Sequence, residues 1–199
     1  MHEYSVIGHP RERIIFIIAF ISIIVGPIVI SILGEIYSSL TGQVFSLSIA
    51  VMSIFSGLYF LFNKWFWKIR LFSKIFSFPN LNGTWVCSGE TLDTSGSIKY
   101  QWSGQIRIEQ SWDKLLITLV TENSKSSSLS VVGGIRYIPT IGYKLSYSYE
   151  NDPNIGEVDL KKHEGFCELV FSENLESSSG HYFNGANRFT FGRINLIKD

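Results

Sequence analysis

The sequence predicts a membrane-embedded pair of helices followed by an all-β domain, and two observations lead to this prediction. Residues 14–34 and 36–63 contain no Asp, Glu, Lys or Arg, and only Glu35 separates them. About 20 apolar residues in a helix cross a hydrocarbon layer of roughly 30 Å, so either stretch is long enough to span a membrane. From Asn80 onward, apolar and polar residues alternate between clusters of Gly, Asn and Ser, which is typical of antiparallel sheet.

These patterns divide the chain at residue 79. We expect residues 1–79 to hold transmembrane helices at about 14–34 and 44–63 and a juxtamembrane linker, and residues 80–199 to form the β-domain. The first part carries six basic and three acidic residues, whereas the second carries eleven basic and fourteen acidic ones. Nucleic-acid binding needs a basic face, which a mildly acidic composition does not favour, so neither DNA nor RNA is an expected partner. The net count leaves open a compact basic spot inside a pocket.

Basic residues predict the orientation in the membrane. They flank the two apolar stretches on their outer sides, and the link between the stretches has none. By the positive-inside rule, both termini are then cytoplasmic and the protein is multi-pass. The first stretch is too long for the apolar core of a cleaved signal peptide. The flanking basic residues are Arg11, Arg13, Lys64, Lys68, Arg70 and Lys74.

Small residues are frequent in the second apolar stretch. They permit close helix approach, either within the hairpin or between copies of the protein, and the sequence leaves both possibilities open. Neither stretch contains a charged residue that could serve an ion pathway, which argues against a transporter. The small residues are Ser46, Ser48, Ala50, Ser53, Ser56 and Gly57.

The clearest strand pattern lies in residues 98–110, where apolar and aromatic side chains share one parity and polar side chains the other. About eight short strands predict an antiparallel up-and-down β-barrel, lipocalin-like in outline, with a sandwich as the alternative. An eight-stranded barrel is just wide enough to hold one small ligand. Further strands are expected near 82–90, 114–122, 126–138, 142–151, 164–173 and 187–197, with a weaker one near 180–184.

Strand parity selects the polar side chains that face the barrel interior. Tyr147, Tyr149 and Asn151 lie at the inward-facing positions of their strand. Thr121 is the last inward-facing residue of the strand near 114–122. The tyrosines offer rings for stacking and hydroxyls for hydrogen bonds, and the asparagine offers a bidentate amide. Either tyrosine can instead fill core and bond a carbonyl group.

Three further candidates lie near the expected barrel mouth. Ser124 and Ser126 belong to a polar hairpin after Thr121, although serine runs are commonly solvated turns. Arg188 shares the inward parity of the last strand, where it can bind a phosphate. It can equally cap Trp85 by a cation–π contact at the barrel end.

No catalytic or metal-binding constellation is visible. His163 and His181 lack a Cys or His at metal-ligand spacing, and no nucleophile elbow, P-loop or kinase signature occurs. Cys87 and Cys167 fall in strand-like segments, where a free cysteine behaves as a small buried hydrophobe; a disulfide is the alternative. We therefore expect no enzyme activity, no metal and no cofactor.

A set of motifs occurs in order along the chain: the N-terminal hairpin, Leu81–Trp85, Ile108–Trp112, Thr121–Ser128, Tyr147–Pro153, His163–Gly165, Gly180–Tyr182, Asn187–Arg188 and Gly192–Leu196. Together these motifs resemble one family, the two-transmembrane effectors with a cyclic-dinucleotide-receptor β-barrel from CBASS antiphage systems. The resemblance implies a 3′,3′-cyclic dinucleotide ligand, with bases that the sequence does not identify. It also implies assembly into a homo-oligomer in the bacterial inner membrane, loss of membrane integrity and death of the infected cell.

A second resemblance gives the alternative function. Gly83-Thr84-Trp85 is similar to the motif that opens lipocalin barrels. It implies a membrane-anchored, lipocalin-like barrel that binds a lipid or small apolar ligand. A structural scaffold without a ligand is a third class.

Overall fold

The computed structural model describes residues 1–41, 47–122, 127–152, 162–185 and 189–199. These residues form two compact units. Met1–Gly8 and Ser77–Asp199 make the sheet unit, and His9–Phe76 make the helical unit. We expected residues 1–79 to form one N-terminal segment, and the structure groups the first eight of these residues with the sheet unit.

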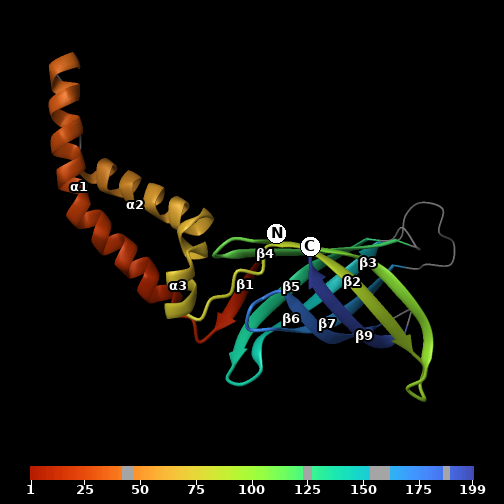
Figure 1. Ribbon diagram of the computed structural model, residues 1–199. Coiled ribbons are helices and arrows are strands. Elements are labelled where there is room, and N and C mark those ends of the chain that lie inside the picture. Colours follow the sequence, from red (N-terminus) through yellow and green to blue (C-terminus); the bar gives the residue numbers. More distant parts are fainter. Residues whose placement is uncertain (42–46, 123–126, 153–161, 186–188) are drawn as a thin grey trace. The chain divides into compact units, whose positions relative to one another are not determined.

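The helical unit contains α1 (Arg11–Thr41), α2 (Leu47–Lys64), the 3-10 helix η1 (Phe66–Lys68) and α3 (Arg70–Ile75). Among the described residues, only α1 is both long and apolar enough to cross a membrane. The first expected span therefore lies in a longer helix than predicted, and the second span remains a prediction. Pro27 lies inside α1, where it removes one backbone hydrogen bond, and the helix changes direction along its length (Figure 1).

Small side chains of α1 face α2. Ser22 and Gly26 are buried, and a Cβ atom built on Gly26 would lie 3.0 Å from Cγ2 of Val51 in α2. By contrast, Ser53 and Gly57 on α2 are exposed, and no described atom lies within 4 Å of a Cβ built on Gly57. Ser53 and Gly57 are thus not the residues at the close contact with Gly26 within the hairpin.

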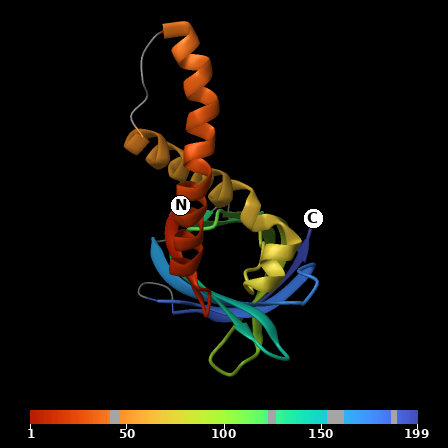
Figure 2. The same ribbon diagram turned by 90° about the vertical axis from the view of Figure 1, so that its left-hand side faces the viewer.

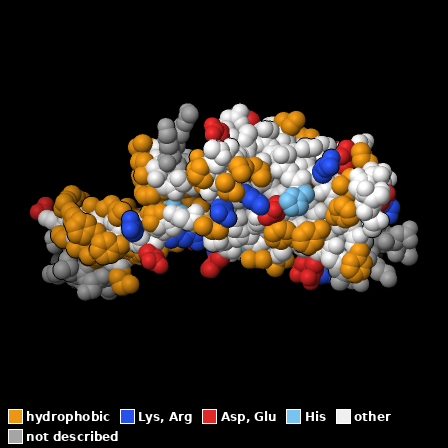
Figure 3. All heavy atoms as spheres, turned by 90° about the horizontal axis from the view of Figure 1, so that it is seen from below, with side chains coloured by type: hydrophobic (Ala, Val, Ile, Leu, Met, Phe, Trp, Pro, Cys, Tyr) orange, Lys and Arg blue, Asp and Glu red, His pale blue; other side chains and the backbone are white. Residues whose placement is uncertain are grey.

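Large apolar side chains cover much of the helical unit (Figure 3). Phe16 of α1 is 71% exposed and Met52 of α2 is 72% exposed. Apolar surface of this extent suits contact with lipid hydrocarbon or with another protein.

The described part of the sheet unit contains nine strands. Each strand from β2 to β9 pairs antiparallel with the next in sequence, and β9 pairs with β2. The sheet thus closes into a barrel, with its strands curving round a common interior (Figures 1 and 2). The strands are β1 (His2–Ile7), β2 (Gly83–Leu92), β3 (Ile98–Gln110), β4 (Lys114–Thr121), β5 (Ser127–Ile138), β6 (Gly142–Asp152), β7 (His163–Phe171), β8 (Ser177–Asn184) and β9 (Phe191–Lys198).

The eight strands expected from periodicity are present, and β1 is an addition that we did not expect. It fills a gap between β4 and β5, which pair with each other only around Leu119 and Ser128. β1 runs parallel to β5 from Tyr4 onward and meets β4 at its first residues. Without β1, the facing backbone edges of β4 and β5 would be unpaired over most of their length.

Gln110, at the end of β3, binds two segments of the sheet unit. One is β1, which precedes the helical unit in the sequence, and the other is the segment between the helical unit and β2. Its side chain accepts a hydrogen bond from the Leu81 amide (2.8 Å) and donates to the Tyr4 hydroxyl (2.8 Å) and the Pro79 carbonyl (3.1 Å). The Gln110 residue is only 4% exposed, so these bonds form away from water. One amide thus fixes β1 and the segment before β2 to the same strand.

The barrel core is packed with aromatic side chains at the end where β2 begins. Trp85 is fully buried, and its ring lies edge-on to that of Phe171 with centroids 5.1 Å apart. Its indole nitrogen donates to the Leu81 carbonyl (3.2 Å), and Nζ of Lys198 lies 5.5 Å from the ring centroid. This end of the barrel is therefore filled by protein.

Candidate ligand-binding pocket

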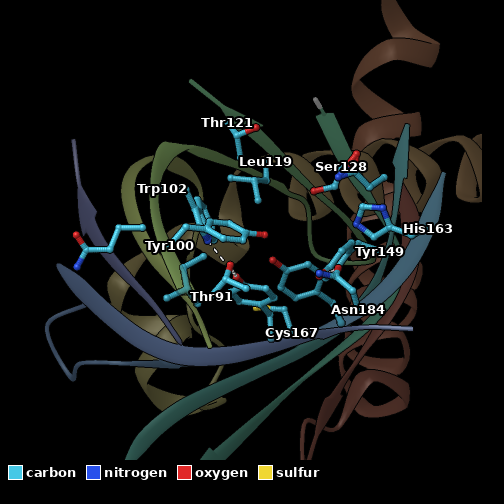
Figure 4. Close-up of a pocket in the computed structure, with 15 residues that line it drawn as sticks. Thr91, Tyr100, Trp102, Leu119, Thr121, Ser128, Tyr149, His163, Cys167 and Asn184 are labelled. Carbon is cyan, nitrogen blue, oxygen red and sulfur yellow. Dashed lines mark hydrogen bonds between the residues drawn. The ribbon is translucent and has the colours of Figure 1, made fainter. Parts of the chain in front are cut away.

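The opposite end of the barrel holds a cavity of about 290 Å³. Every strand from β2 to β9 contributes to its lining. The cavity lies at the end of the barrel where β2, β4, β6 and β8 finish and the next strand of each pair begins. A volume near 300 Å³ is at the lower end of the range for ligand pockets. The lining residues are Thr91, Tyr100, Gln101, Trp102, Leu119, Thr121, Ser128, Tyr147, Tyr149, Asn151, His163, Cys167, Tyr182, Asn184 and Ile194 (Figure 4).

A hydrogen-bonded cluster holds the aromatic side chains on one wall. Nε1 of Trp102 donates to the hydroxyl of Tyr182 (3.0 Å), which lies 2.6 Å from Oγ1 of Thr91. The two rings meet edge to face with centroids 5.7 Å apart. Because Thr91 and Tyr182 are buried, this cluster holds the indole in one orientation.

A second cluster lies on another wall. The hydroxyl of Tyr149 donates to Oδ1 of Asn184 (2.8 Å), and Nδ2 of Asn184 donates to Oγ1 of Thr190 (2.7 Å). Tyr147, two residues before Tyr149, is only 5% exposed, and burial together with nearby Cys167 raises its hydroxyl pKa well above the usual value. Tyr147 is thus mainly a core side chain, whereas Tyr149 is only partly buried.

The described lining carries hydroxyl, amide and imidazole groups but no Lys, Arg, Asp or Glu. Oδ1 of Asn151 is buried and has no hydrogen-bond partner among the residues that the structure describes. An unpaired buried amide oxygen is costly, and a ligand that donates a hydrogen bond to it would remove that cost.

Two family models match this sequence. One, described as the Cap15 cyclic dinucleotide receptor domain, matches residues 76–198, and the other, described as Cap15 TM helices, matches residues 12–68. The chain belongs to the Cap15 family. A curated relative, CD-NTase-associated protein 15 of Yersinia aleksiciae, is 39% identical over 207 aligned positions, which cover 99% of this chain and 97% of that protein.

Membership in the Cap15 family confirms the resemblance to cyclic-dinucleotide receptors with transmembrane helices. The receptor-domain match begins at residue 76 and coincides with the main part of the sheet unit, Ser77–Asp199. The pocket therefore lies in a cyclic dinucleotide receptor domain. Cap15 proteins are receptors rather than enzymes, as the sequence predicted.

Four of the seven predicted site residues line the pocket: Thr121, Tyr147, Tyr149 and Asn151. Strand parity thus identified side chains that face the cavity, and their contact with a ligand remains a prediction. Ser124, Ser126 and Arg188 lie outside the described residues, so both roles considered for Arg188 remain predictions. In the described part of the barrel, the cation beside Trp85 is that of Lys198.

Sequence reasoning did not select Trp102, Tyr182, His163 or Asn184 as candidates. Trp102 had a usable signal, because it shares the inward parity of residues 98–110. The expected strand near 180–184 was too weak for its parity to assign Tyr182. His163 is buried and lines the pocket, although we considered it only as a metal ligand.

Both cysteines are buried and unbridged, which confirms that they act as small core side chains. Burial raises the pKa of Cys87 and of Cys167 to about 12, so both thiols are protonated at neutral pH. Cys167 lines the pocket, where it contributes a neutral, weakly polar surface. Among the described residues, no group of three His, Cys, Asp or Glu could hold a metal ion.

Proposed function

We propose that the pocket binds a 3′,3′-linked cyclic dinucleotide and that binding drives the protein to assemble in the bacterial inner membrane. Assembly then disrupts the membrane and kills the infected cell, which limits phage growth. The main support is that the receptor domain encloses a pocket with aromatic rings and neutral hydrogen-bonding groups side by side. Bases need flat rings to stack on, and sugars and phosphates need hydrogen-bond donors.

Polar groups in the lining favour a nucleotide over a fatty acid. An acyl chain next to Asn151 would cover its buried Oδ1 without donating a hydrogen bond to it, and an unpaired buried group costs free energy. A cyclic dinucleotide carries hydroxyl and base N–H groups that can donate to this oxygen. Arg188 and the hydroxyls of Ser124 and Ser126 remain our candidates for the phosphates.

We further propose that both apolar stretches cross the membrane and that both termini are cytoplasmic. The match to the family's transmembrane helices extends over residues 12–68, a range that includes α2 and all of α1 except Arg11. α2 has 18 residues, close to the length needed for a span. Basic residues flank this region on both sides, which favours a cytoplasmic sheet unit.

Binding by the full-length protein tests the proposed ligand. We expect the protein in detergent to bind at least one 3′,3′-cyclic dinucleotide made from A, C, G or U, and to bind the linear dinucleotide of the same bases more weakly. Isothermal titration calorimetry measures both affinities, and palmitate and oleate serve as comparison ligands. Binding of a fatty acid alone would support the lipocalin-like alternative, and binding of neither class would support a scaffold.

A reporter fusion tests the topology. Alkaline phosphatase, which is active only in the periplasm, should stay inactive when fused after Asp199, because basic residues hold the sheet unit in the cytoplasm. The same reporter inserted after Thr41, between α1 and α2 in the sequence, should be active and serves as the control. Activity of the fusion after Asp199 would contradict both the orientation and access to a cytoplasmic second messenger.

A further inference from the structure

Two aromatic side chains of the pocket lie against glycines of neighbouring strands. Gly89 of β2 is paired with Trp102 of β3, and Gly165 of β7 is paired with Tyr149 of β6. A methyl group on Gly89 would collide with the indole of Trp102, and one on Gly165 would collide with the phenol ring of Tyr149. Each ring therefore occupies space that the side chain of any other residue would need.

The polar edge of each ring is also held. The indole nitrogen of Trp102 donates to Tyr182, and the hydroxyl of Tyr149 donates to Asn184. With the glycine backbone beside the ring and a hydrogen bond at its edge, each ring has a set orientation. Both rings line the cavity (Figure 4), so part of their surface is available to a ligand.

The two rings stand on opposite walls of the barrel. The strands close in the order β1-β4-β3-β2-β9-β8-β7-β6-β5, so β3 and β6 are separated by four strands along one path and by three along the other. Figure 4 shows Trp102 and Tyr149 on the two sides of the same cavity. A ligand between these walls therefore meets one ring on each side.

We propose that Trp102 and Tyr149 are two preset stacking surfaces, and that each receives one base of the ligand. This inference rests on the proposed function and extends it, because two separate surfaces predict a ligand that carries two bases. It prefers Trp102 to Tyr147, which the sequence suggested as a stacking residue, because Tyr147 lines the pocket but is only 5% exposed. Gly89 and Gly165 act as positioning residues that keep the rings in place.

Alanine at either glycine tests the proposal, because it leaves the ring present but displaces it. In the full-length protein in detergent, Gly89→Ala and Gly165→Ala should each weaken binding of the best 3′,3′-cyclic dinucleotide by about tenfold to a hundredfold. The double variant should show the product of the two losses, since the sites are on separate walls. The corresponding mononucleotide should bind far more weakly than the dinucleotide, because it can use only one surface.

Conservative variants distinguish a stacking role from a structural one. Trp102→Phe and Tyr149→Phe keep a flat ring and should bind within about fivefold of the wild type, whereas Trp102→Leu and Tyr149→Leu should lose about as much as the glycine variants. The leucine variants also keep the test decisive if a glycine variant does not fold. A base stacked on Trp102 should quench its fluorescence, and Trp102→Phe should remove that quenching.

The outcomes separate this inference from the function on which it rests. If no cyclic dinucleotide binds the wild-type protein, the proposed function is wrong and this inference fails with it. If the wild type binds but the folded leucine variants bind equally well, only the stacking surfaces are wrong. Gly134→Ala, in β5 and outside the pocket lining, controls for the general effect of alanine at a strand glycine.

Discussion

Replacing Gly57 with leucine is expected to abolish killing without weakening the binding of a cyclic dinucleotide. A ligand can drive assembly only if it binds the assembled form better than the resting form. In the assembled form, the helices of neighbouring copies need small residues at their contacts, because lipid supplies no hydrophobic drive between helices. Gly57 lies on the exposed side of α2 with no described atom within 4 Å of a Cβ, so leucine should disturb contacts between copies rather than the hairpin.

The measurements are survival of cells that make the messenger, and oligomer size by light scattering in detergent. Cells with Gly57→Leu should survive like cells without the protein, and the ligand should no longer raise the oligomer size. Ala50→Leu, in the same helix, should have the same effects on survival and on oligomer size. Met52→Leu is the matched control, because it adds no bulk to an already large exposed side chain, and it should kill normally.

Gly26→Leu distinguishes contacts within the hairpin from contacts between copies. Its side chain would meet Val51 of the same chain, so it should disturb α1 and α2 even without ligand. Liposome leakage supplies the critical result for the mechanism. A ligand-saturated protein that keeps its resting size yet permeabilises liposomes would contradict assembly as the cause of membrane damage.

Gln110→Leu is expected to cause the largest loss of stability among single polar substitutions in the sheet unit. Leucine has a similar size but leaves the buried Leu81 amide and Pro79 carbonyl without the hydrogen bonds that Gln110 supplies, whereas the Tyr4 hydroxyl keeps its bond to the Ser111 carbonyl. Each buried group left unpaired costs about 1–3 kcal/mol, so the free energy of unfolding should fall by on the order of 3 kcal/mol. A loss of this size lowers Tm by roughly 10 °C in a domain of this length.

Near-ultraviolet circular dichroism of the full-length protein during heating measures this effect. Gln105→Leu is the matched control, because Gln105 lies on the same strand but is exposed, and its Tm should stay within about 2 °C of the wild type. An equal Tm for Gln110→Leu and the wild type would show that the bonds to Leu81, Pro79 and Tyr4 are not important for the fold. A fragment of residues 80–199 should also be unstable, since it lacks β1 and leaves β4 and β5 with unpaired edges.

Local patterns in the sequence were sufficient to predict much of this protein. Two-residue alternation reports which face of a strand is buried, so the eight strands after residue 80 could be recognised, and Tyr149 and Asn151 could be assigned to the interior. The uncharged stretch from Ile14 predicted an apolar helix, and the structure has α1 there. These predictions succeed because the pleat of a strand and the pitch of a helix are set by neighbouring residues.

What the sequence could not decide depends on residues far apart in the chain. β1 is a strand only because β4 and β5 separate and leave it two edges to pair with, about 110 to 130 residues away. The orientation of the Trp102 ring depends in the same way on strand register. That register places Gly89 opposite Trp102 and brings the Tyr182 hydroxyl to the indole nitrogen. The sequence by itself therefore determined the barrel's strands, its inward faces and the apolar helix, whereas only the closure of the sheet decided which rings face each other across the pocket. Closure sets these contacts because strand pairing joins distant segments in one register, and a single sequence read locally does not contain that register.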